Sequence, residues 1–577
     1  MGSSSNLFAS IDMGTNSFKM LIVQADRSGK FLTIDRHKNP VCLGRDSSTS
    51  ISIESHFRSL ECLQQFSKIL KYNNVSPHRT RCVATAALRE ADNAIEFQKA
   101  IHENTGLDVV VLSGEEEARF VYLGVLQFLP VFDKRVLVVD IGGGSTEFVI
   151  GEKGNAILRV SLKLGHVGLT QKFHTDGINS DMREFVRLVI KESGLVEAVK
   201  ECGFEVVVGT SGTIRAIEKA VFYSYGEDLV AGNEILFRDC KRDWKFTRGE
   251  LRCVVDRLCK EGEREKSRRD EFFKRRSEFI LAGAVLLEEI FEVLGIDELE
   301  VSEYALGEGV IAETLTQVFE GYDLNANVRW HSVVRLATRF GDKSTIKSAA
   351  RCSVIAKEVF EGLTKWVEIA DNHDKIDTHL AEKDLECLQA ACLLHNIGLF
   401  TGKKGYHKQT YRIITSGDYL QGYSDEEVKL IALLTRHHRK KFPKSDHSTI
   451  AEISEELKKR FRILCVIIRI SVMLQENDCL DLQDMEFLCS DGGFKLMFRE
   501  ASDRTASPVG RDMERKLQKE LAQFKIVKFS VHCQYYFLFY QINIVTIVNS
   551  CSFECHQIFQ RLLSVEVLPC SLETSKR

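Results

Sequence analysis

Several features that would assign the chain to a specialised class are scarce or absent. Only six of the 577 residues are proline, which argues against collagen-like or long disordered stretches. The 17 cysteines form no Cys-x-x-Cys pair, so they predict reduced thiols in the core of an intracellular protein. The first residues contain neither a basic segment nor an apolar run, and we therefore expect no targeting segment and a cytoplasmic location.

Three catalytic signatures are missing as well. The sequence contains no Gly-x-x-x-x-Gly-Lys-Ser/Thr, so any phosphate-binding turn in this chain is not a P-loop. It also contains neither His-Glu-x-x-His nor Gly-x-Ser-x-Gly, the signatures of zinc metalloproteases and of serine hydrolases with a nucleophile elbow.

Length and charge limit the architecture and the partners. A chain of 577 residues is too long for one hydrophobic core and suggests three or four domains. The formal net charge of −4 argues against a uniformly basic nucleic-acid-binding protein. Residues 395–445 nevertheless contain ten Lys or Arg against four Asp or Glu, which predicts either a polyanion-binding surface or a solvated helix face. Residues 529–550 are uncharged, but their polar side chains favour a strand pair or an aggregation-prone tail over a membrane anchor.

A strand-turn-strand pattern occurs twice. Residues 7–11 are apolar and lead into Asp12-Met13-Gly14-Thr15-Asn16-Ser17, after which residues 18–23 again have strand character. The pattern returns at residues 136–139, which lead into Asp140-Ile141-Gly142-Gly143-Gly144-Ser145-Thr146-Glu147 and then residues 148–150. This repetition predicts an internal duplication.

The remaining pattern predicts layered α/β structure followed by helices. A third apolar run, residues 206–208, precedes Gly209-Thr210-Ser211-Gly212-Thr213, and a helical pattern follows it. Amphipathic helices alternate with short apolar runs in the first 315 residues, which is typical of α/β layers. Helical periodicity dominates residues 333–475. A hairpin pattern at 485–498 and a charged helix at about 511–524 predict a small α+β unit.

The glycine turns suit phosphate chemistry. Backbone N–H groups can approach several phosphate oxygens at once, and glycine allows that approach because it has no Cβ. Asp140, at the end of its strand, is placed to hold a divalent metal directly or through water. A plain tight hairpin explains one such turn equally well, whereas two facing turns with carboxylates predict a clamp for phosphate and metal.

Four segments in this order carry a family resemblance. They are Asp12-x-Gly-Thr-Asn-Ser, the run from Ser113 to Arg119 (Ser-Gly-Glu-Glu-Glu-Ala-Arg), Asp140-Ile-Gly-Gly-Gly-Ser-Thr-Glu, and Gly209-Thr-Ser-Gly-Thr. The chain resembles the exopolyphosphatase and guanosine pentaphosphate phosphohydrolase family of the actin-like superfamily. The resemblance implies two actin-like (ribonuclease H-like) α/β half-domains at 1–128 and 129–316, an all-α degenerate HD-like domain at 317–446 and a C-terminal α+β unit at 447–577.

The resemblance also implies roles for individual residues. Glu117 matches the carboxylate that activates water, although a solvated glutamate in the first helical turn is the plainer interpretation. Arg89 matches an arginine that reaches the phosphate, and Mg²⁺ or Mn²⁺ is the implied cofactor. The implied metal ligands are Asp12, Asp140 and Glu147. The implied phosphate-binding residues, besides Arg89, are Gly14, Thr15, Asn16, Ser17, Gly142, Gly143, Gly144, Ser145, Gly209, Ser211, Gly212 and Thr213.

Three positions depart from the family pattern. Gly307 and Cys42 stand where relatives commonly have arginine, which predicts fewer phosphate contacts and an altered substrate range or lower activity. Asn396 replaces the aspartate of an HD metal step at His395, so no second metal centre is expected. The basic helical region instead predicts a polyphosphate-binding lane. Its members are Lys403, Lys404, His407, Lys408, Arg436, His437, His438 and Arg439.

The predicted activity is release of the terminal phosphate from inorganic polyphosphate or guanosine pentaphosphate by water attack. Two alternatives remain at this point: an ATP-dependent kinase with the same fold, and a non-catalytic sensor of polyphosphate or an alarmone. No nucleic-acid partner is expected, because aromatic residues do not interleave the cations in the sequence. No membrane partner is expected either, because of the polar side chains in residues 529–550. A homodimer is a further expectation.

Overall fold

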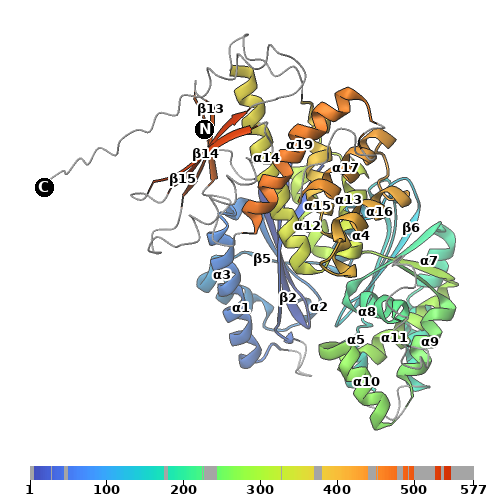
Figure 1. Cartoon of the computed structure of the whole chain (residues 1–577). Helices are drawn as coiled ribbons and strands as arrows, with labels where there is room; N and C mark the ends of the chain where they lie inside the picture. Colours follow the sequence, from blue (N-terminus) through green and yellow to red (C-terminus); the bar gives the residue numbers. More distant parts are fainter. Residues whose placement is uncertain are drawn as a thin grey trace, which may run out of the picture. The chain divides into compact units, whose positions relative to one another are not determined.

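The computed structural model forms two compact units, Met1–Arg335 and Leu336–Arg577. It describes residues 6–173 except 28 and 44–49, then 180–223, 225, and 244–476 except 261, 326–327, 370–379, 440–449 and 451–452. Four strands between 485 and 546 are also described. Figure 1 shows both units, with many of their helices and strands labelled.

The first sheet is built from five strands in the order β3-β2-β1-β4-β5. Strand β1 is central and almost wholly buried, which its apolar sequence explains, and it pairs antiparallel with β2 and parallel with β4. Helices α1 (Ile53–Tyr72) and α3 (Ala94–Thr105) pack against each other beside this sheet, and the short α2 (Ala86–Arg89) follows β4. The strands are β1 (Leu7–Met13), β2 (Ser17–Ala25), β3 (Phe31–Pro40), β4 (Thr80–Ala84) and β5 (Val109–Val111).

The second sheet repeats this plan in the order β10-β11-β9-β6-β7-β8. Strand β6 pairs antiparallel with β7 and parallel with β9, as β1 pairs with β2 and β4. The predicted duplication and the predicted fold class are therefore confirmed. The strands are β6 (Val136–Ile141), β7 (Thr146–Glu152), β8 (Asn155–Leu162), β9 (Val206–Thr210), β10 (Lys245–Thr247) and β11 (Glu298–Val301). The helices are α5 (His166–Lys172), α6 (Asp181–Glu192), α7 (Leu195–Cys202), α8 (Ser211–Phe222), α9 (Arg248–Leu258), α10 (Glu263–Phe273) and α11 (Ser277–Leu294), with 3-10 turn η4 (Lys274–Arg276).

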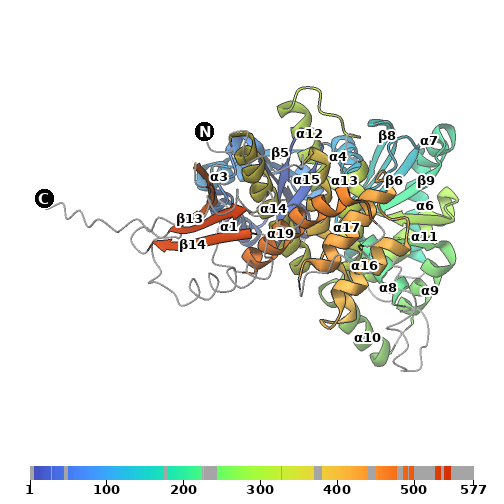
Figure 2. The same ribbon diagram turned by 45° about the horizontal axis from the view of Figure 1, so that its top comes forward.

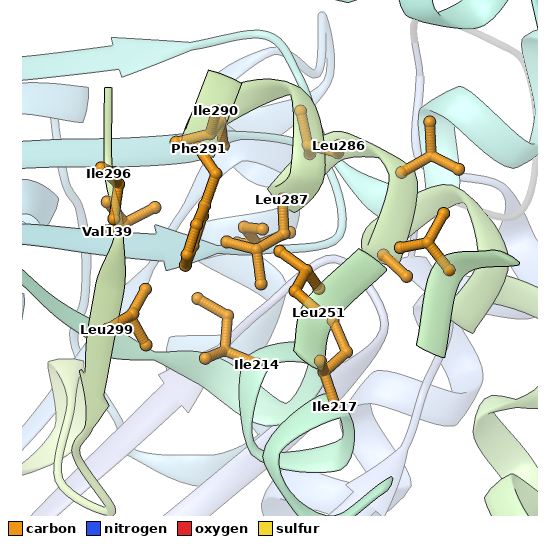
Figure 3. Close-up of a cluster of buried hydrophobic side chains, with 14 of the residues drawn as sticks. Val139, Ile214, Ile217, Leu251, Leu286, Leu287, Ile290, Phe291, Ile296 and Leu299 are labelled. Atoms are coloured by element: carbon orange, nitrogen blue, oxygen red, sulfur yellow. The ribbon is translucent and has the colours of Figure 1, made fainter. Parts of the chain in front are cut away.

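The core of the second half is a continuous cluster of aliphatic and aromatic side chains. Figure 3 shows Ile214 from α8, Leu251 from α9 and Leu287 from α11 meeting side chains from β6 and β11. Helices α9 and α11 lie side by side in Figures 1 and 2. Because α11 is apolar on most of its surface, it is buried among the neighbouring helices and anchors the elements around it.

Two helices join the halves of the first unit. Helix α4 (Gly114–Leu126) packs on β6, β7 and β8 of the second sheet, whereas α12 (Leu306–Val318) packs on β1 and β2 of the first. The two helices pack closely against each other because both carry glycine at the crossing. A Cβ on Gly124 would lie 2.0 Å from the Ala305 carbonyl oxygen, and one on Gly309 would lie 1.7 Å from that of Phe120. Although α12 follows the second sheet in sequence, its sheet contacts are with the first half.

The second unit contains helices and a four-stranded antiparallel sheet in the order β12-β13-β15-β14. The hairpin predicted at 485–498 is present, and residues 527–534 pair with residues 539–546 as antiparallel strands. The charged helix predicted at 511–524 and the end of the tail lie outside the described residues. Helix α13 (Val328–Phe340) crosses the division between the units. The other elements are α14 (Lys343–Ile369), α15 (Glu382–Leu394), η5 (Ile397–Thr401), α16 (Tyr406–Ser416), α17 (Asp425–His437), α19 (Glu455–Gln475), β12 (Met485–Ser490), β13 (Gly493–Arg499), β14 (Val527–Gln534) and β15 (Phe539–Thr546).

Within the described part of the chain, no helix combines the length and apolar character that a bilayer crossing needs.

The glycine crossing yields a stability prediction. Gly309→Ala should destabilise the protein by about 3 kcal/mol, because the added methyl group would overlap the Phe120 carbonyl and force the helices apart. The measurement is the unfolding midpoint in urea. The matched control is Gly168→Ala in α5, where the methyl group would meet no atom within 4 Å and alanine is the better helix former. Equal stability of the two variants would contradict the role of the crossing.

Candidate phosphate-binding site

The duplicated turns face each other in the first unit. One joins β1 to β2 and contains Thr15, and the other joins β6 to β7. A Cβ placed on Gly143 would lie 3.1 Å from the Thr15 Cβ, and one on Gly144 would lie 3.1 Å from the Thr15 Oγ1. The two turns therefore approach at a distance that a side chain at either glycine would disturb. The structure brings together the two halves of the predicted clamp.

The second turn has two backbone donors available. The Gly142 N–H donates to the Ser145 carbonyl at 2.9 Å and closes the turn. The carbonyls of Gly142 and Gly143 accept from the N–H groups of His166 and Val167 at 3.1 and 3.0 Å. Among the described residues, no hydrogen bond involves the N–H groups of Gly143 and Gly144. Successive free amides in a fixed turn favour binding of an anion.

Glu117 lies in the first turn of α4, and its position follows from a helix cap. Ser113 is the N-cap and accepts from the Glu116 N–H at 3.2 Å, while the Glu116 carboxylate pairs with Arg119. Glu117 is only 7% exposed, so the interpretation as a solvated glutamate is wrong. The Arg89 Nη1 donates to the Glu117 Oε2 at 3.0 Å and to the Leu112 carbonyl at 3.0 Å.

Four carboxylates influence one another around this point. Burial raises the pKa of Glu117 to about 7, with Asp12 and Asp140 acting in the same direction and Arg89 opposing them. Burial also raises the pKa of Asp140 to about 6. The pKa of Glu147 lies well above its ordinary value because the group is buried near Glu117 and Asp140. Strongly perturbed carboxyl groups that converge on one place are typical of functional sites.

The carboxylates offer oxygen atoms that suit a divalent metal. Asp140 Oδ1 and Glu147 Oε2 are buried and lack a hydrogen-bond partner in the described part of the chain. The Ser161 hydroxyl donates to the other oxygen of Glu147 at 2.8 Å. No group of three or more His, Cys, Asp or Glu with metal-binding geometry occurs among the described residues. Mg²⁺ commonly uses one or two carboxylates together with waters and substrate phosphates, so the two free oxygens fit it.

Asp12 differs from the other two predicted metal ligands. The Lys19 Nζ lies 2.8 Å from the Asp12 Oδ2, and the two residues stand opposite each other in the β1–β2 ladder. The pairing with Asp12 raises the pKa of Lys19. One oxygen of Asp12 is therefore held by an ammonium group in this structure.

The third glycine segment is placed differently from the prediction. Gly209 lies inside β9, where a Cβ would strike Leu299, and Thr213 packs against Gly283 of α11. These two residues serve packing in the core, which corrects their assignment to phosphate binding. Ser211 and Gly212 stand at the start of α8, and Ser211 has φ +99°, an uncommon backbone conformation for a residue other than glycine.

Two arginines near this segment were not predicted. A Cβ on Gly212 would overlap the Arg276 guanidinium, at 2.0 Å from Nη2, so that group lies directly against the backbone. Burial and the neighbouring Arg215 lower the pKa of Arg276 to about 10. Arg215 donates to the Ser211 carbonyl at 2.9 Å and pairs with Glu303. Residue spacing alone gave no signal for this arrangement, because η4 meets α8 only through the tertiary fold.

The positions that depart from the family pattern have defined contacts. The Cys42 N–H donates to the Asn16 carbonyl at 3.0 Å, and the Cys42 thiol donates to the Asn16 Oδ1 at 3.4 Å. Cys42 therefore touches the first turn without supplying a cation. A Cβ on Gly307 would lie 3.2 Å from the Ser10 Oγ, so this residue faces the first sheet.

The predicted lane in the second unit is smaller than the sequence indicates. His407, His437 and His438 are buried, so their inclusion in a surface lane is corrected. The Tyr406 hydroxyl lies 3.0 Å from the His438 Nε2, and the Arg439 Nη1 donates to that hydroxyl at 2.9 Å. Lys403, Lys404, Lys408 and Arg439 are exposed, and Arg436 is half-buried.

Tyrosine rings accompany two of these cations, contrary to the expectation from sequence. Arg439 lies over the Tyr406 ring and Arg436 over the Tyr411 ring, at 5.2 and 4.9 Å from the centroids. The absence of interleaved aromatic residues therefore no longer argues against nucleic-acid binding.

The first unit combines two α/β halves with a duplicated glycine turn and a buried carboxylate cluster. The family model described as the Ppx/GppA phosphatase family matches residues 22–318, and the model described as Ppx/GppA phosphatase, domain III matches residues 328–498. The chain belongs to the Ppx/GppA phosphatase family.

Two solved structures match about half of the chain. The chain is 25% identical to an exopolyphosphatase from Cytophaga hutchinsonii, with a TM-score of 0.47, and the match covers 54% of this chain and 98% of that one. It is 28% identical to the Ppx/GppA family member from Aquifex aeolicus, with a TM-score of 0.45, over 55% of this chain and 99% of that one.

The raised pKa of Asp140 predicts an effect on stability. In the folded state the Asp140 carboxyl keeps its proton up to about pH 6, whereas in the unfolded state it loses the proton near the ordinary pKa of 3.8. The free energy of unfolding therefore falls as pH rises between these two values. Asp140→Asn should therefore be more stable than the wild type at pH 8, by roughly 1.4 kcal/mol for each pH unit that separates the folded-state pKa from the unfolded-state pKa. The two should be equally stable below pH 3.5.

The measurement is thermal unfolding of both proteins with a chelator present, at pH 8 and at pH 3.5. Lower stability of the variant at pH 8 would show that the buried carboxylate stabilises the fold instead of straining it.

Proposed function

We propose that this protein hydrolyses the terminal phosphoanhydride bond of inorganic polyphosphate or of the 5′ end of guanosine pentaphosphate. The observation that carries the proposal is the buried Glu117 carboxylate, held by Arg89 within a cluster that also contains Asp12 and Asp140. A carboxyl group with a pKa of about 7 is well matched to accept a proton at neutral pH. Both substrates present the same terminal group, so the class of bond is proposed and the choice between them is left to experiment.

The terminal phosphate would be bound by donors from both turns. The free N–H groups of Gly143 and Gly144 provide one set, and the side chains of Asn16 and Ser17 provide another. Arg89 would contact the phosphate with the guanidinium atoms that do not hold Glu117. Binding in this position would exclude bulk water and leave one water molecule beside Glu117.

Glu117 would then take a proton from that water as the water attacks the terminal phosphorus atom in line with the leaving oxygen. Asp140 and Glu147 would hold Mg²⁺ or Mn²⁺ through their unpartnered oxygens. The cation supplies charge that stabilises the oxygens of the transferring group. Lys19 pairs with Asp12 and adds a further positive charge at this side.

The exposed cations of the second unit would themselves bind a long polyphosphate chain. Lys403, Lys404, Lys408 and Arg439 carry this role in the proposal, without the buried histidines. Each cation neutralises phosphate charge, so binding of long chains should weaken steeply as salt is raised. The cytoplasmic location and the homodimer stay predictions.

Removal of the general base tests the proposal. Glu117→Gln should lower phosphate release from polyphosphate by about 10²–10⁴-fold, because the amide cannot accept the proton of water. Polyphosphate binding should change little. The assay is release of orthophosphate with Mg²⁺ and no acceptor. The matched control is Glu116→Gln, which alters the neighbouring, exposed glutamate and should keep nearly full activity.

The same assay separates the other two functions. A kinase would release no phosphate from polyphosphate and would transfer the terminal phosphate of ATP to an added acceptor. A sensor would bind polyphosphate but never turn it over. Either result for the wild type would contradict the proposal.

The acidic limb of the pH profile provides a second test. Since Glu117 must be ionised to act, kcat/KM should rise with pH through a midpoint near 7. Arg89 favours the ionised form, so Arg89→Met should move this midpoint to higher pH and also weaken substrate binding. A midpoint that shifts downward or stays in place in the variant would show that another group controls the limb.

A further inference from the structure

His166 is a buried polar residue beside the second glycine turn that the proposed reaction does not use. It begins α5, and its backbone N–H donates to the Gly142 carbonyl at 3.1 Å. The side chain is only 7% exposed, and its ring packs against Phe279 with 5.6 Å between centroids. The His166 Nδ1 is buried and has no hydrogen-bond partner in the described part of the chain. A buried polar atom without a partner is unfavourable, and a ligand that bonds to it would remove that cost.

The charges around His166 are positive. Burial lowers the pKa of His166 to about 3, with Arg276 and Lys38 contributing in the same direction by repelling a proton. The ring is therefore neutral at physiological pH and keeps one N–H donor. The carboxylates behave differently, because Asp12, Asp140 and Glu117 act on one another. The site thus has an acidic end and a cationic end.

The cationic end brings two arginines together. No ion pair of Arg276 is found among the described residues, whereas Arg215 pairs with Glu303. The charge of Arg215 lowers the pKa of Arg276, and the Arg276 guanidinium lies directly against the backbone at Gly212. An anion bound here would offset the repulsion between the two arginines and give the His166 N–H an acceptor.

We propose that His166 donates a hydrogen bond to a phosphate group of the substrate other than the one that is hydrolysed. The inference rests on the proposed function, and it defines the substrate class more narrowly: a chain of linked phosphates that reaches from the carboxylates to the cationic end. A neutral donor suits this position because it binds the anion without adding charge to a crowded set of cations. His166 acts as a binding residue for the retained part of the substrate.

The experiment compares a ligand long enough to span the acidic and the cationic end of the site with a ligand that can occupy only one end. Inorganic tripolyphosphate and orthophosphate are titrated into the Glu117→Gln protein with Mg²⁺, and the heat of binding is measured. His166→Ala, made in the same background, should raise the Kd for tripolyphosphate roughly tenfold or more, as loss of a hydrogen bond to a charged group implies. The Kd for orthophosphate should stay within about twofold of the parent value.

Matched variants separate a lost donor from a disturbed fold. His166→Asn and His166→Gln keep an amide N–H near Nδ1 and Nε2 respectively, so at least one of them should recover most of the affinity. His166→Leu fills a similar volume without a donor and should behave like His166→Ala. Thermal unfolding of all four variants identifies any that do not fold, and the remaining donor and non-donor variants still decide the question.

Several results would overturn the inference. They are an unchanged Kd for tripolyphosphate, equal weakening of both ligands, failure of both amide variants to recover affinity, and absence of tripolyphosphate binding by the parent protein. The proposed function is judged separately by phosphate release from the wild type. If the wild type releases no phosphate, hydrolysis is refuted. The binding role of His166 still stands in that case if His166→Ala selectively weakens tripolyphosphate binding.

Discussion

The close crossing of α4 and α12 is the contact on which the site depends. Gly124 and Gly309 remove the side chains that would otherwise separate these helices. Helix α4 packs on the second sheet and carries Glu117, while α12 packs on the first sheet and carries no residue of the predicted site. The crossing therefore holds the two duplicated turns at a fixed separation. A wider crossing would move Glu117 away from Arg89, which comes from the first half.

The buried charges of the site destabilise the folded protein. The same charges are arranged so that they can bind a ligand. Glu117, Asp140 and Glu147 are buried near one another, and each has a raised pKa because a charged form is poorly solvated there. On the other side, Arg276 and Arg215 repel each other. A metal-bound polyanion would complement both ends, since the cation meets the carboxylates and the phosphates meet the arginines. The charges that would bind this ligand lower the stability of the folded protein, and such a trade-off is common at functional sites.

Patterns among residues close together in the sequence predicted much of the fold. The strand-turn-strand duplication was visible because alternating apolar residues and glycines are local signals. Other assignments failed for tertiary reasons. Gly209 resembles a turn glycine in sequence but lies in a strand against Leu299. His407, His437 and His438 follow or precede cations, yet the helix faces that carry them point inward. A run of residues cannot show which face is buried until its neighbours are known.

By itself, the sequence determined the duplicated turns, the layered halves, the helical region and the family to which the chain belongs. Those features depend on residues close together in the chain, whose conformational preferences act before the fold forms. Only the tertiary structure decided that Glu117 is buried against Arg89, that Lys19 holds Asp12, and that Arg276 and His166 stand at a cationic end. The contact of Glu117 with Arg89 and the cationic end join residues far apart in sequence, whereas Lys19 and Asp12 meet across one hairpin. The strength of all these contacts depends on burial, which no local pattern specifies.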